Sequence, residues 1–459
     1  MSPYKMAIPV LLATVLVSRV FGSAVDAGAP QGSTHALRHV TVVDASTAPR
    51  SDLTVLIRDG RIVAIGPDRD LPVPPGAVTH DGSGRFVIPG LWDAHVHLSQ
   101  AGSTAFPLFL ANGVTSVRDM GSDLNQIRLW QRARAEGQLI PRILTPGPKI
   151  DERSPRDEWP GDAETRIVGS PVEARRTVDE LKAKGVDFIK VHNIHSRAVF
   201  EAIAEESRLQ GLPFAGHLPD EPGALGAVAL GQRTIEHGRG MLSCSAEMRA
   251  RIRSDPDGAR LTRNCAPEAV QAEILPALRR AGTWYTPTLV SFRGHRMVGA
   301  PALANWLAKL HGIEQTTPSL KRQWEKMAGP APDALERELL SGFGSLALAA
   351  KRSGVPLLAG SDLGDPYVVP GFGLHDELQL LVEAGVSPGD ALGSATLEPA
   401  RAFGLSADLG SVQPGKIADL VVLDANPLSD IRNTRRIRAV IIGGRWLDAE
   451  DLTPLTAPR

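Results

Sequence analysis

Two histidines, His95 and His97, stand two positions apart at the end of an apolar stretch of this 459-residue chain. On a β-strand, side chains two positions apart point the same way. Both imidazoles would then face one point, as ligands of a divalent metal ion do. Taken alone, such a pair is more often two half-buried strand histidines, so the rest of the chain must decide.

Three further residues that can bind metal each close a short apolar segment: His217, His237 and Asp362. If these segments are strands of a (β/α)8 barrel, their carboxyl ends converge on one mouth, where catalytic groups sit. Four histidines and one carboxylate gathered there would be difficult to satisfy without a cation. The pattern therefore predicts a metal site.

Lys190 ends another apolar segment and is predicted to reach the same mouth. An ammonium group beside a dication would be repelled, and burial would lower its pKa toward that of a neutral amine. A neutral amine can add carbon dioxide, and the resulting carbamate can bridge two metal ions through its two oxygens. On its own, a lysine at a strand end is more often solvated or part of a salt bridge.

The elements that must position these residues alternate between short apolar segments and amphipathic helices, a pattern typical of a parallel sheet covered by helices. The predicted strands begin near Phe86, Val114, Arg142, Asp187, Phe214, Thr234, Trp284 and Leu357. The fold class is therefore α/β, with a (β/α)8 barrel over residues 86–405 and a helical insert at about 241–345. Ser170-Pro171 and Ser387-Pro388 are typical helix starts.

Both ends of the chain are rich in β-strand patterns. Alternating apolar and polar residues flank Asp59-Gly60, and a similar pattern surrounds Gly443-Gly444. Such dipeptides between alternating runs predict β-hairpins. Residues 35–85 and 406–459 are therefore predicted to form one smaller β-sandwich domain assembled from both chain ends.

The bulk composition excludes some classes of partner and suggests export. Lys and Arg number 50 against 51 Asp and Glu, so no nucleic-acid partner is expected. Residues 1–27 resemble a signal peptide, which predicts a periplasmic or secreted protein without a stable membrane span after cleavage; an uncleaved anchor or a disordered tail is the alternative. In an oxidising compartment Cys244 and Cys265 could form a disulfide. A homo-oligomer is compatible with the sequence.

Taken together, these residues resemble the metal-dependent amidohydrolase superfamily, in the branch similar to imidazolonepropionases and Xaa-Pro dipeptidases. The resemblance extends along essentially the whole mature chain. The motifs that carry it are Pro89-Gly90-Leu91-Trp92-Asp93-Ala94-His95-Val96-His97, Phe188-Ile189-Lys190-Val191, Gly216-His217, Ile235-Glu236-His237-Gly238, Gly360-Ser361-Asp362 and the segment from Gly410 to Asp424.

The resemblance implies a barrel fused to a β-sandwich and a centre of two divalent metal ions, commonly zinc. His95, His97 and Asp362 would hold the more buried ion. The outer ion would be held by His217 and His237, and carbamylated Lys190 would bridge the two. Imidazolonepropionases resemble a one-metal version, so a single ion remains an alternative.

Two cations that share a water lower its pKa from ~15.7 toward ~7. The metal-bridging hydroxide would attack the carbonyl of an amide or peptide-like C–N bond, as in dipeptides or acylated amino acids. We predict that Asp362 is catalytic and transfers the proton to the leaving nitrogen. His192, two positions after Lys190, would bind the substrate or pack at the mouth.

The sequence leaves several roles open. Arg118-Asp119 would bind a substrate carboxylate or form a structural ion pair, and the ion pair is the favoured alternative. His295 and His311 receive no role. Segment Thr145–Lys149 lacks the histidine that dipeptidases of this branch often carry, which puts recognition of a free carboxylate in doubt. The same site would serve an ester, a lactone or a cyclic amide; release of ammonia or a non-catalytic binding protein is the more distant alternative.

Overall fold

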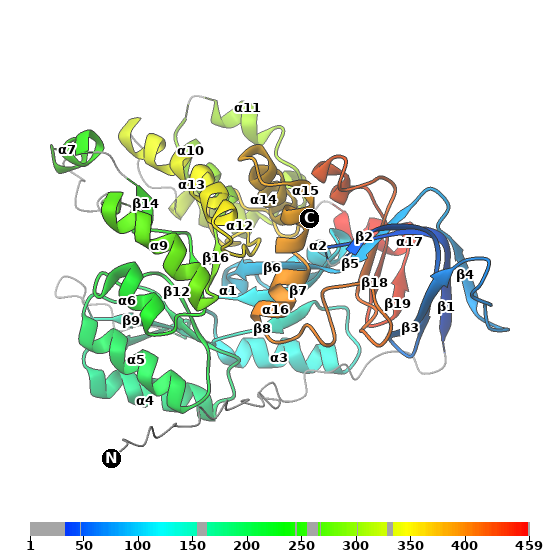
Figure 1. Ribbon diagram of the computed structural model, residues 1–459, viewed down its shortest axis with the longest axis horizontal. Helices are drawn as coiled ribbons and strands as arrows, with labels where there is room; N and C mark the ends of the chain where they lie inside the picture. The colour runs from blue at the N-terminus through cyan, green and yellow to red at the C-terminus, as the bar shows by residue number, and fades with distance from the viewer. Residues whose placement is uncertain are drawn as a thin grey trace, which may run out of the picture.

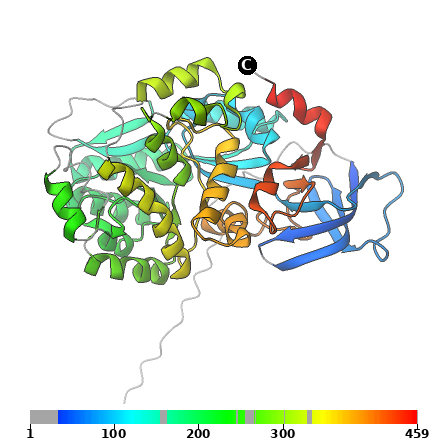
Figure 2. The same cartoon turned by 90° about the horizontal axis from the view of Figure 1, so that it is seen from above.

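The computed structural model describes residues 33–45, 47–153, 163–243, 246–254, 265–266, 268–300, 302–327 and 334–457. Parallel strands and their covering helices make up the larger part of the molecule, and strands from both chain ends lie together at one side (Figure 1). Figure 2 shows these end strands beside the helices from above. The predicted α/β class is confirmed.

The end strands form one mixed sheet in the order β19-β18-β17-β5-β1-β2-β3, with β4 paired to β1. Within it, β17 lies antiparallel to β5, so the C-terminal strands join the N-terminal ones. Asp59 and Gly60 connect β2 to β3 with φ of 49° and 75°, as a two-residue hairpin turn requires. The bounds are β1 (Thr34–Asp44), β2 (Thr47–Arg58), β3 (Arg61–Pro67), β4 (Val78–Asp81), β5 (Phe86–Pro89), β17 (Leu420–Leu423), β18 (Ile437–Ile442) and β19 (Arg445–Leu447).

The strands in the middle of the chain pair in parallel, in the orders β6-β7-β8 and β10-β9-β11-β12-β13-β16. A small pair, β14 and β15, lies apart from them. The bounds are β6 (Leu91–Val96), β7 (Val114–Asp119), β8 (Arg142–Leu144), β9 (Lys149–Glu152), β10 (Thr165–Val168), β11 (Ile189–Val191), β12 (Phe214–Gly216), β13 (Thr234–Glu236), β14 (Leu242–Ser243), β15 (Cys265–Ala266) and β16 (Trp284–Thr286).

Backbone hydrogen bonds link the two larger parallel sheets at two places. On one side the Asp187 amide donates to the Thr145 carbonyl at 2.9 Å. On the other, the segment 355–363 lies between β16 and β6: Leu358 donates to Tyr285 at 2.9 Å, and Ala94 donates to Ala359 at 2.9 Å. This segment makes isolated bridges and not the strand predicted from Leu357.

The strand predicted from Phe86 is also divided, because Gly90 separates β5 in the end sheet from β6 in the parallel sheet. A Cβ at Gly90 would lie 2.2 Å from the Thr115 hydroxyl oxygen of β7. Only glycine therefore allows the two strands this close an approach.

Helices follow most of the parallel strands, and the predicted starts are observed: the Ser170 and Ser387 side chains accept hydrogen bonds from Glu173 and Asp390 amides at 3.3 and 3.1 Å. The bounds are α1 (Leu98–Ala101), α2 (Ala105–Ala111), α3 (Leu124–Ala135), α4 (Pro171–Ala183), α5 (Arg197–Leu209), α6 (Gly223–Ala229), α7 (Ala246–Ser254), α9 (Glu268–Ala281), α10 (Leu289–Met297), α11 (Leu303–Leu307), α12 (Pro318–Met327), α13 (Ala334–Arg352), α14 (Phe372–Glu383), α15 (Pro388–Ser394), α16 (Leu397–Ala402) and α17 (Ala449–Leu452), with the 3-10 helices η2 (Ile313–Gln315), η3 (Ile431–Arg435) and η4 (Thr453–Thr456).

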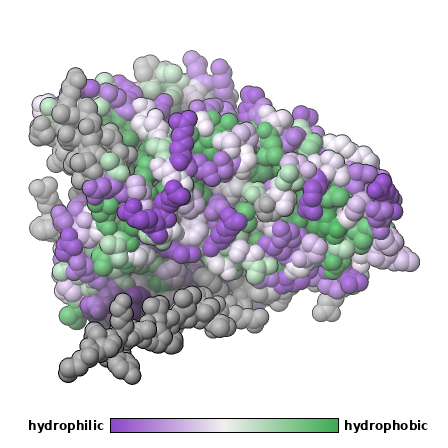
Figure 3. All heavy atoms as spheres, viewed as in Figure 1, coloured by the Kyte–Doolittle hydropathy of each residue, from purple (hydrophilic) through white to green (hydrophobic). Residues whose placement is uncertain are grey.

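Two apolar clusters fill the space between the parallel strands and their helices, and a separate cluster is formed by residues of the end sheet. On the face shown in Figure 3, hydrophilic residues are interspersed with smaller hydrophobic patches. Within the described ranges, no helix is both long and apolar enough to cross a membrane. The predicted signal peptide and Cys244 lie outside the described residues, so cleavage and the disulfide stay predictions, as do the domain boundaries.

Candidate metal centre

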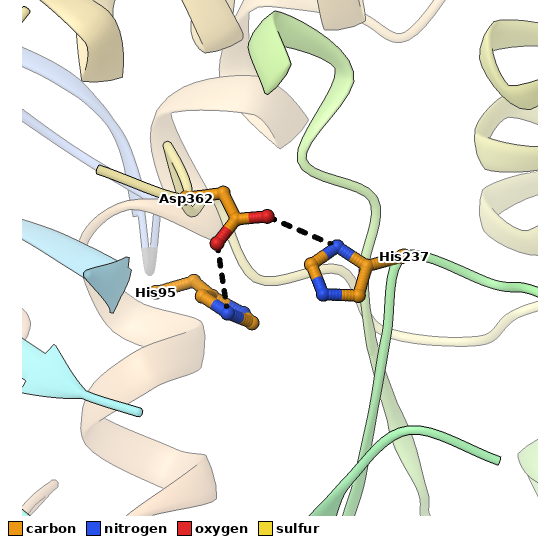
Figure 4. A group of neighbouring side chains, drawn as sticks. All are labelled: His95, His237 and Asp362. Carbon is orange, nitrogen blue, oxygen red and sulfur yellow. Dashed lines mark ion pairs between the residues drawn. The ribbon is translucent and has the colours of Figure 1, made fainter. Parts of the chain in front are cut away.

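Asp362 lies between the rings of His95 and His237, which come from distant parts of the chain (Figure 4). Its Oδ1 is 3.2 Å from His95 Nε2, and its Oδ2 is 3.4 Å from His237 Nδ1. One ligand atom from each of these three buried residues lies within 4.8 Å of the others. Imidazole nitrogens and a carboxylate at this spacing are a donor set suited to zinc.

The other predicted histidines adjoin this group. His97, directly after β6, places its Nε2 3.5 Å from Asp362 Oδ1. His217, directly after β12, has its ring centroid 4.8 Å from that of His237. The structure thus brings all four histidines and Asp362 together at the carboxyl ends of the parallel strands.

Lys190, on β11, completes the predicted set. Its side chain is 0% exposed, and its Nζ has no hydrogen-bond partner among the described residues. Burial lowers the pKa of Lys190 to about 8, against the opposing charges of Glu236 and Asp362. A buried amine without a partner is costly. Conversion of this amine to a carbamate that binds metal would remove that cost, so the residue fits such a role.

A buried carboxylate behind His95 fixes the orientation of its ring. Glu236, the last residue of β13, places Oε2 3.1 Å from His95 Nδ1. In a neutral His95 the proton then lies on Nδ1, and the lone pair of Nε2 is available to bind a metal ion beside Asp362. The sequence motif contained Glu236, but nothing in the sequence assigned it this role.

Arg118, on β7, compensates the charge of Glu236. Its Nη2 donates to Glu236 Oε2 at 2.9 Å, its Nε donates to the Ala94 carbonyl at 2.6 Å, and its Nη1 donates to the Thr234 hydroxyl at 2.8 Å. Burial raises the pKa of Glu236, but the Arg118 charge and the His95 hydrogen bond outweigh it and hold that pKa well below its usual range. Arg118 therefore forms the structural ion pair, and its partner is Glu236.

Asp119, beside Arg118 in sequence, has different partners. It accepts hydrogen bonds from the Leu98 amide at 3.1 Å, the Ser122 hydroxyl at 2.6 Å and the Thr145 hydroxyl at 2.9 Å. These bonds hold the loop after His97 against β7 and β8. Its role is to position this loop.

Asp93 is a second buried carboxylate that sequence reasoning missed. It accepts hydrogen bonds from the Ser361 amide and hydroxyl at 2.8 and 2.6 Å. These bonds fix the residue before Asp362 against β6. A carboxylate in the centre of an apolar strand was the signal that could have identified it.

The backbone at the site adopts conformations that side chains rarely take. His237, Thr288 and Asp362 have φ of 64°, 52° and 59°, in the left-handed region. Thr288 also places its hydroxyl 2.8 Å from His237 Nδ1. Such conformations cluster at functional sites, where the surrounding structure holds them in place.

Burial and charge set the protonation of the ligand residues. Burial lowers the pKa of His217 and of His237 well below the ordinary value. Burial also lowers the pKa of His95, but the charge of Asp362 and the hydrogen bonds to Asp362 and Glu236 outweigh it and raise that pKa. Neutral imidazoles are the form that binds metal, so His217 and His237 are ready to do so at neutral pH.

His192 lies beside the site with its ring centroid 4.3 Å from that of His217. Its Nδ1 is 2.8 Å from Asp151 Oδ1, and burial lowers the pKa of His192 to about 4. The ring is therefore neutral and oriented by Asp151. A substrate contact by His192 stays a prediction.

Known proteins resemble this chain in both sequence and fold. The family profile described as the amidohydrolase family matches residues 86–447. An imidazolonepropionase of Symbiobacterium thermophilum is 24% identical over 398 residues, covering 83% of this chain and 85% of its own. A bottromycin amidohydrolase structure is 27% identical with a TM-score of 0.70, covering 92% of this chain and 88% of its own. A prolidase complexed with N-methylphosphonate-L-proline is 23% identical with a TM-score of 0.66, covering 91% and 100%.

The Arg118–Glu236 pair yields a stability prediction. Arg118→Met leaves Glu236 charged and unpaired in the interior, and we expect a loss of about 3–5 kcal/mol in the free energy of unfolding. The double variant Arg118→Met with Glu236→Gln should lose less than the sum of the single losses, because neither charge is then left alone. Denaturant unfolding of the metal-free proteins measures all three.

The exposed pair Arg176–Glu180, whose Nε and Oε1 lie 2.9 Å apart, provides the control. Arg176→Met should lose less than about 0.5 kcal/mol, as surface pairs do. Additive losses at Arg118 and Glu236 would contradict the ion pair as the interaction that stabilises the site.

Proposed function

The chain belongs to the amidohydrolase family, and on that premise we propose that it is a metal-dependent hydrolase that adds water across an amide or peptide-like C–N bond. The resemblance stated from the sequence is thereby confirmed, and the enzyme class with it: the chain is a hydrolase acting on C–N bonds. The single observation that carries the proposal is the convergence of His95, His237 and Asp362 within 4.8 Å.

We propose two divalent ions, with zinc the expected metal. His95, His97 and Asp362 would hold one ion, and His217 and His237 the other. The group within 4.8 Å contains His95 and His237 together, one from each predicted set, so the division of ligands between the ions remains a prediction. The bonds linking the two parallel sheets support the proposed (β/α)8 barrel. The mixed sheet supports a smaller β domain built from both chain ends, and its form as a β-sandwich stays a prediction.

Bound divalent ions would supply a water of lowered pKa and would polarise the carbonyl oxygen of the substrate. The protein's own residues would do the rest. Asp362 would accept the proton of the attacking water on a carboxylate oxygen and deliver it to the leaving nitrogen. Burial raises the pKa of Asp362, but the neighbouring imidazoles of His95, His97 and His237 outweigh it and lower that pKa, so the carboxylate begins the cycle as a base.

The names of similar proteins support a substrate with a C–N bond: imidazolonepropionase, prolidase and amidohydrolase. We propose short peptides or acylated amino acids as the substrate class. A cyclic amide, ester or lactone is the second candidate, since imidazolonepropionase relatives match most of the chain and the activated water does not itself select nitrogen over oxygen.

A substrate panel tests the function. With metal restored, the wild type should hydrolyse members of a set of dipeptides, N-acyl amino acids and aryl amides, and a chelator should abolish this. Asp362→Asn should keep its metal and melting temperature yet lose about 10²–10⁴-fold in kcat, as expected for loss of a general acid–base residue.

Asp123→Asn serves as the isosteric control, because asparagine can replace the Asp123 cap of α3 and leave the fold intact. Hydrolysis of esters or lactones alone would support the second candidate. A metal-loaded wild type that cleaves nothing in the panel, or an active Asp362→Asn, would overturn the proposal.

We propose that Lys190 carries a carbamate that bridges the two ions. Its neutral amine would add carbon dioxide, forming an N–C bond and releasing one proton. Metal-free protein in carbon dioxide-free buffer should then take up zinc faster when bicarbonate is added. With ¹³C-bicarbonate a new carbonyl resonance should appear in the wild type and in Lys184→Met, an exposed lysine, but not in Lys190→Met. Unchanged zinc stoichiometry in Lys190→Met would contradict the bridge.

We propose that the protein is exported to the periplasm or secreted, on the basis of the signal-like residues 1–27. Expressed with its own N-terminus in a Gram-negative host, it should appear in the periplasmic fraction, with cleavage near Ala24 or Ala27. Cell fractionation with N-terminal sequencing checks this. Recovery of the full-length chain in the cytosol would contradict it.

A further inference from the structure

His295, on α10, is a histidine near the metal centre that has no role in the mechanism above. Its Nε2 lies 3.0 Å from Asp365 Oδ2, and the Ser291 hydroxyl donates to the same carboxylate oxygen. Its side chain is 39% exposed, and no described residue hydrogen-bonds its Nδ1. One edge of the ring is therefore fixed to the protein, and the other is free to meet a ligand.

Two elements tie His295 to the mouth of the site. Helix α10 begins directly after Thr288, whose hydroxyl is 2.8 Å from His237 Nδ1, and the Phe292 ring centroid is 6.3 Å from that of His237. Asp365 donates its backbone amide to the Asp362 carbonyl at 3.0 Å. Both residues of the His295–Asp365 pair thus belong to segments that already hold metal ligands in place.

The pair fixes the protons of the ring. Because a carboxylate accepts from Nε2, that nitrogen carries a hydrogen. Burial lowers the pKa of His295, but the hydrogen bond and charge of Asp365 and the charge of Asp362 outweigh it and raise that pKa. A protonated ring presents a second N–H at Nδ1, which is a donor for an anion.

A second cation stands on the same side of the site. Arg239 is exposed and follows His237 by two positions, and its positive charge acts on His295. An anion that reached the mouth would meet both groups. Charge-assisted hydrogen bonds from such groups are the strong ones in proteins.

We propose that His295, oriented by Asp365 and assisted by Arg239, binds a carboxylate of the substrate beside the scissile C–N bond. The proposal rests on the proposed function and narrows its substrate class to acylated amino acids and short peptides with a free carboxylate. The recognition group comes from α10, the helix after β16.

Kinetics with matched substrates test the assignment. For each N-acyl amino acid that the metal-loaded wild type cleaves, its carboxamide counterpart is measured as well. His295→Gln should reduce kcat/KM for the carboxylate form about 10- to 100-fold, as expected for loss of a hydrogen bond to a charged group, mainly through KM. The carboxamide form should change less than about twofold, since it offers no charge to lose. Arg296→Gln, which removes an exposed cation from the next position of α10, should alter neither.

A binding measurement separates this proposal from the function itself. In the Asp362→Asn background, calorimetry should show N-acyl amino acids binding at least tenfold more tightly than their carboxamides, and adding His295→Gln should remove that preference. Equal binding of the two forms, or equal loss of both activities in His295→Gln with a lowered melting temperature, would overturn the subsite. A wild type that cleaves no C–N bond but keeps the preference would overturn the proposed function and leave the subsite supported.

Discussion

The arrangement of the site depends on one buried charge pair, between Arg118 of β7 and Glu236 of β13. Each group would be costly in the interior without the other. Together they satisfy the Ala94 carbonyl, the Thr234 hydroxyl and one edge of the His95 ring. The pair thereby connects the neighbouring strands β6 and β7 to β13, 118 positions further along the chain. The other edge of His95 is left facing Asp362, so a structural interaction determines which nitrogen of a ligand residue is available.

A second constraint acts on the backbone. The segment 355–363 is held between β16 and β6 by single bonds instead of a regular ladder. Asp93 fixes it through Ser361, which allows Asp362 to adopt a left-handed conformation with its carboxylate directed between two rings (Figure 4). The same conformation at His237 and Thr288 shows that strain is concentrated where ligands must converge.

The sequence predicted which residues converge at the site because each closes an apolar segment, and parallel strands of one sheet end at one edge. It could not predict the residues that orient them. Glu236 and Arg118 lie 118 positions apart, and their pairing depends on which inward-facing positions of non-adjacent strands meet. The strand expected at Leu357 and the single strand expected from Phe86 were wrong in detail, because isolated bridges and a glycine needed for close approach leave no periodic signal. His295 received no role for the same reason: its position is set by packing of α10 against the turn after Asp362.

Charge balance links the metal centre to the substrate. Neutral imidazoles add no charge, so the proposed ligand set holds one fixed negative charge at Asp362 and a second once Lys190 carries a carbamate. Glu236 is compensated by Arg118, and Asp365 by His295. Two divalent ions would therefore leave the mouth with excess positive charge, to which Arg239 adds. A positively charged site attracts anions and raises their local concentration. The charge of the site therefore favours a substrate that carries a carboxylate.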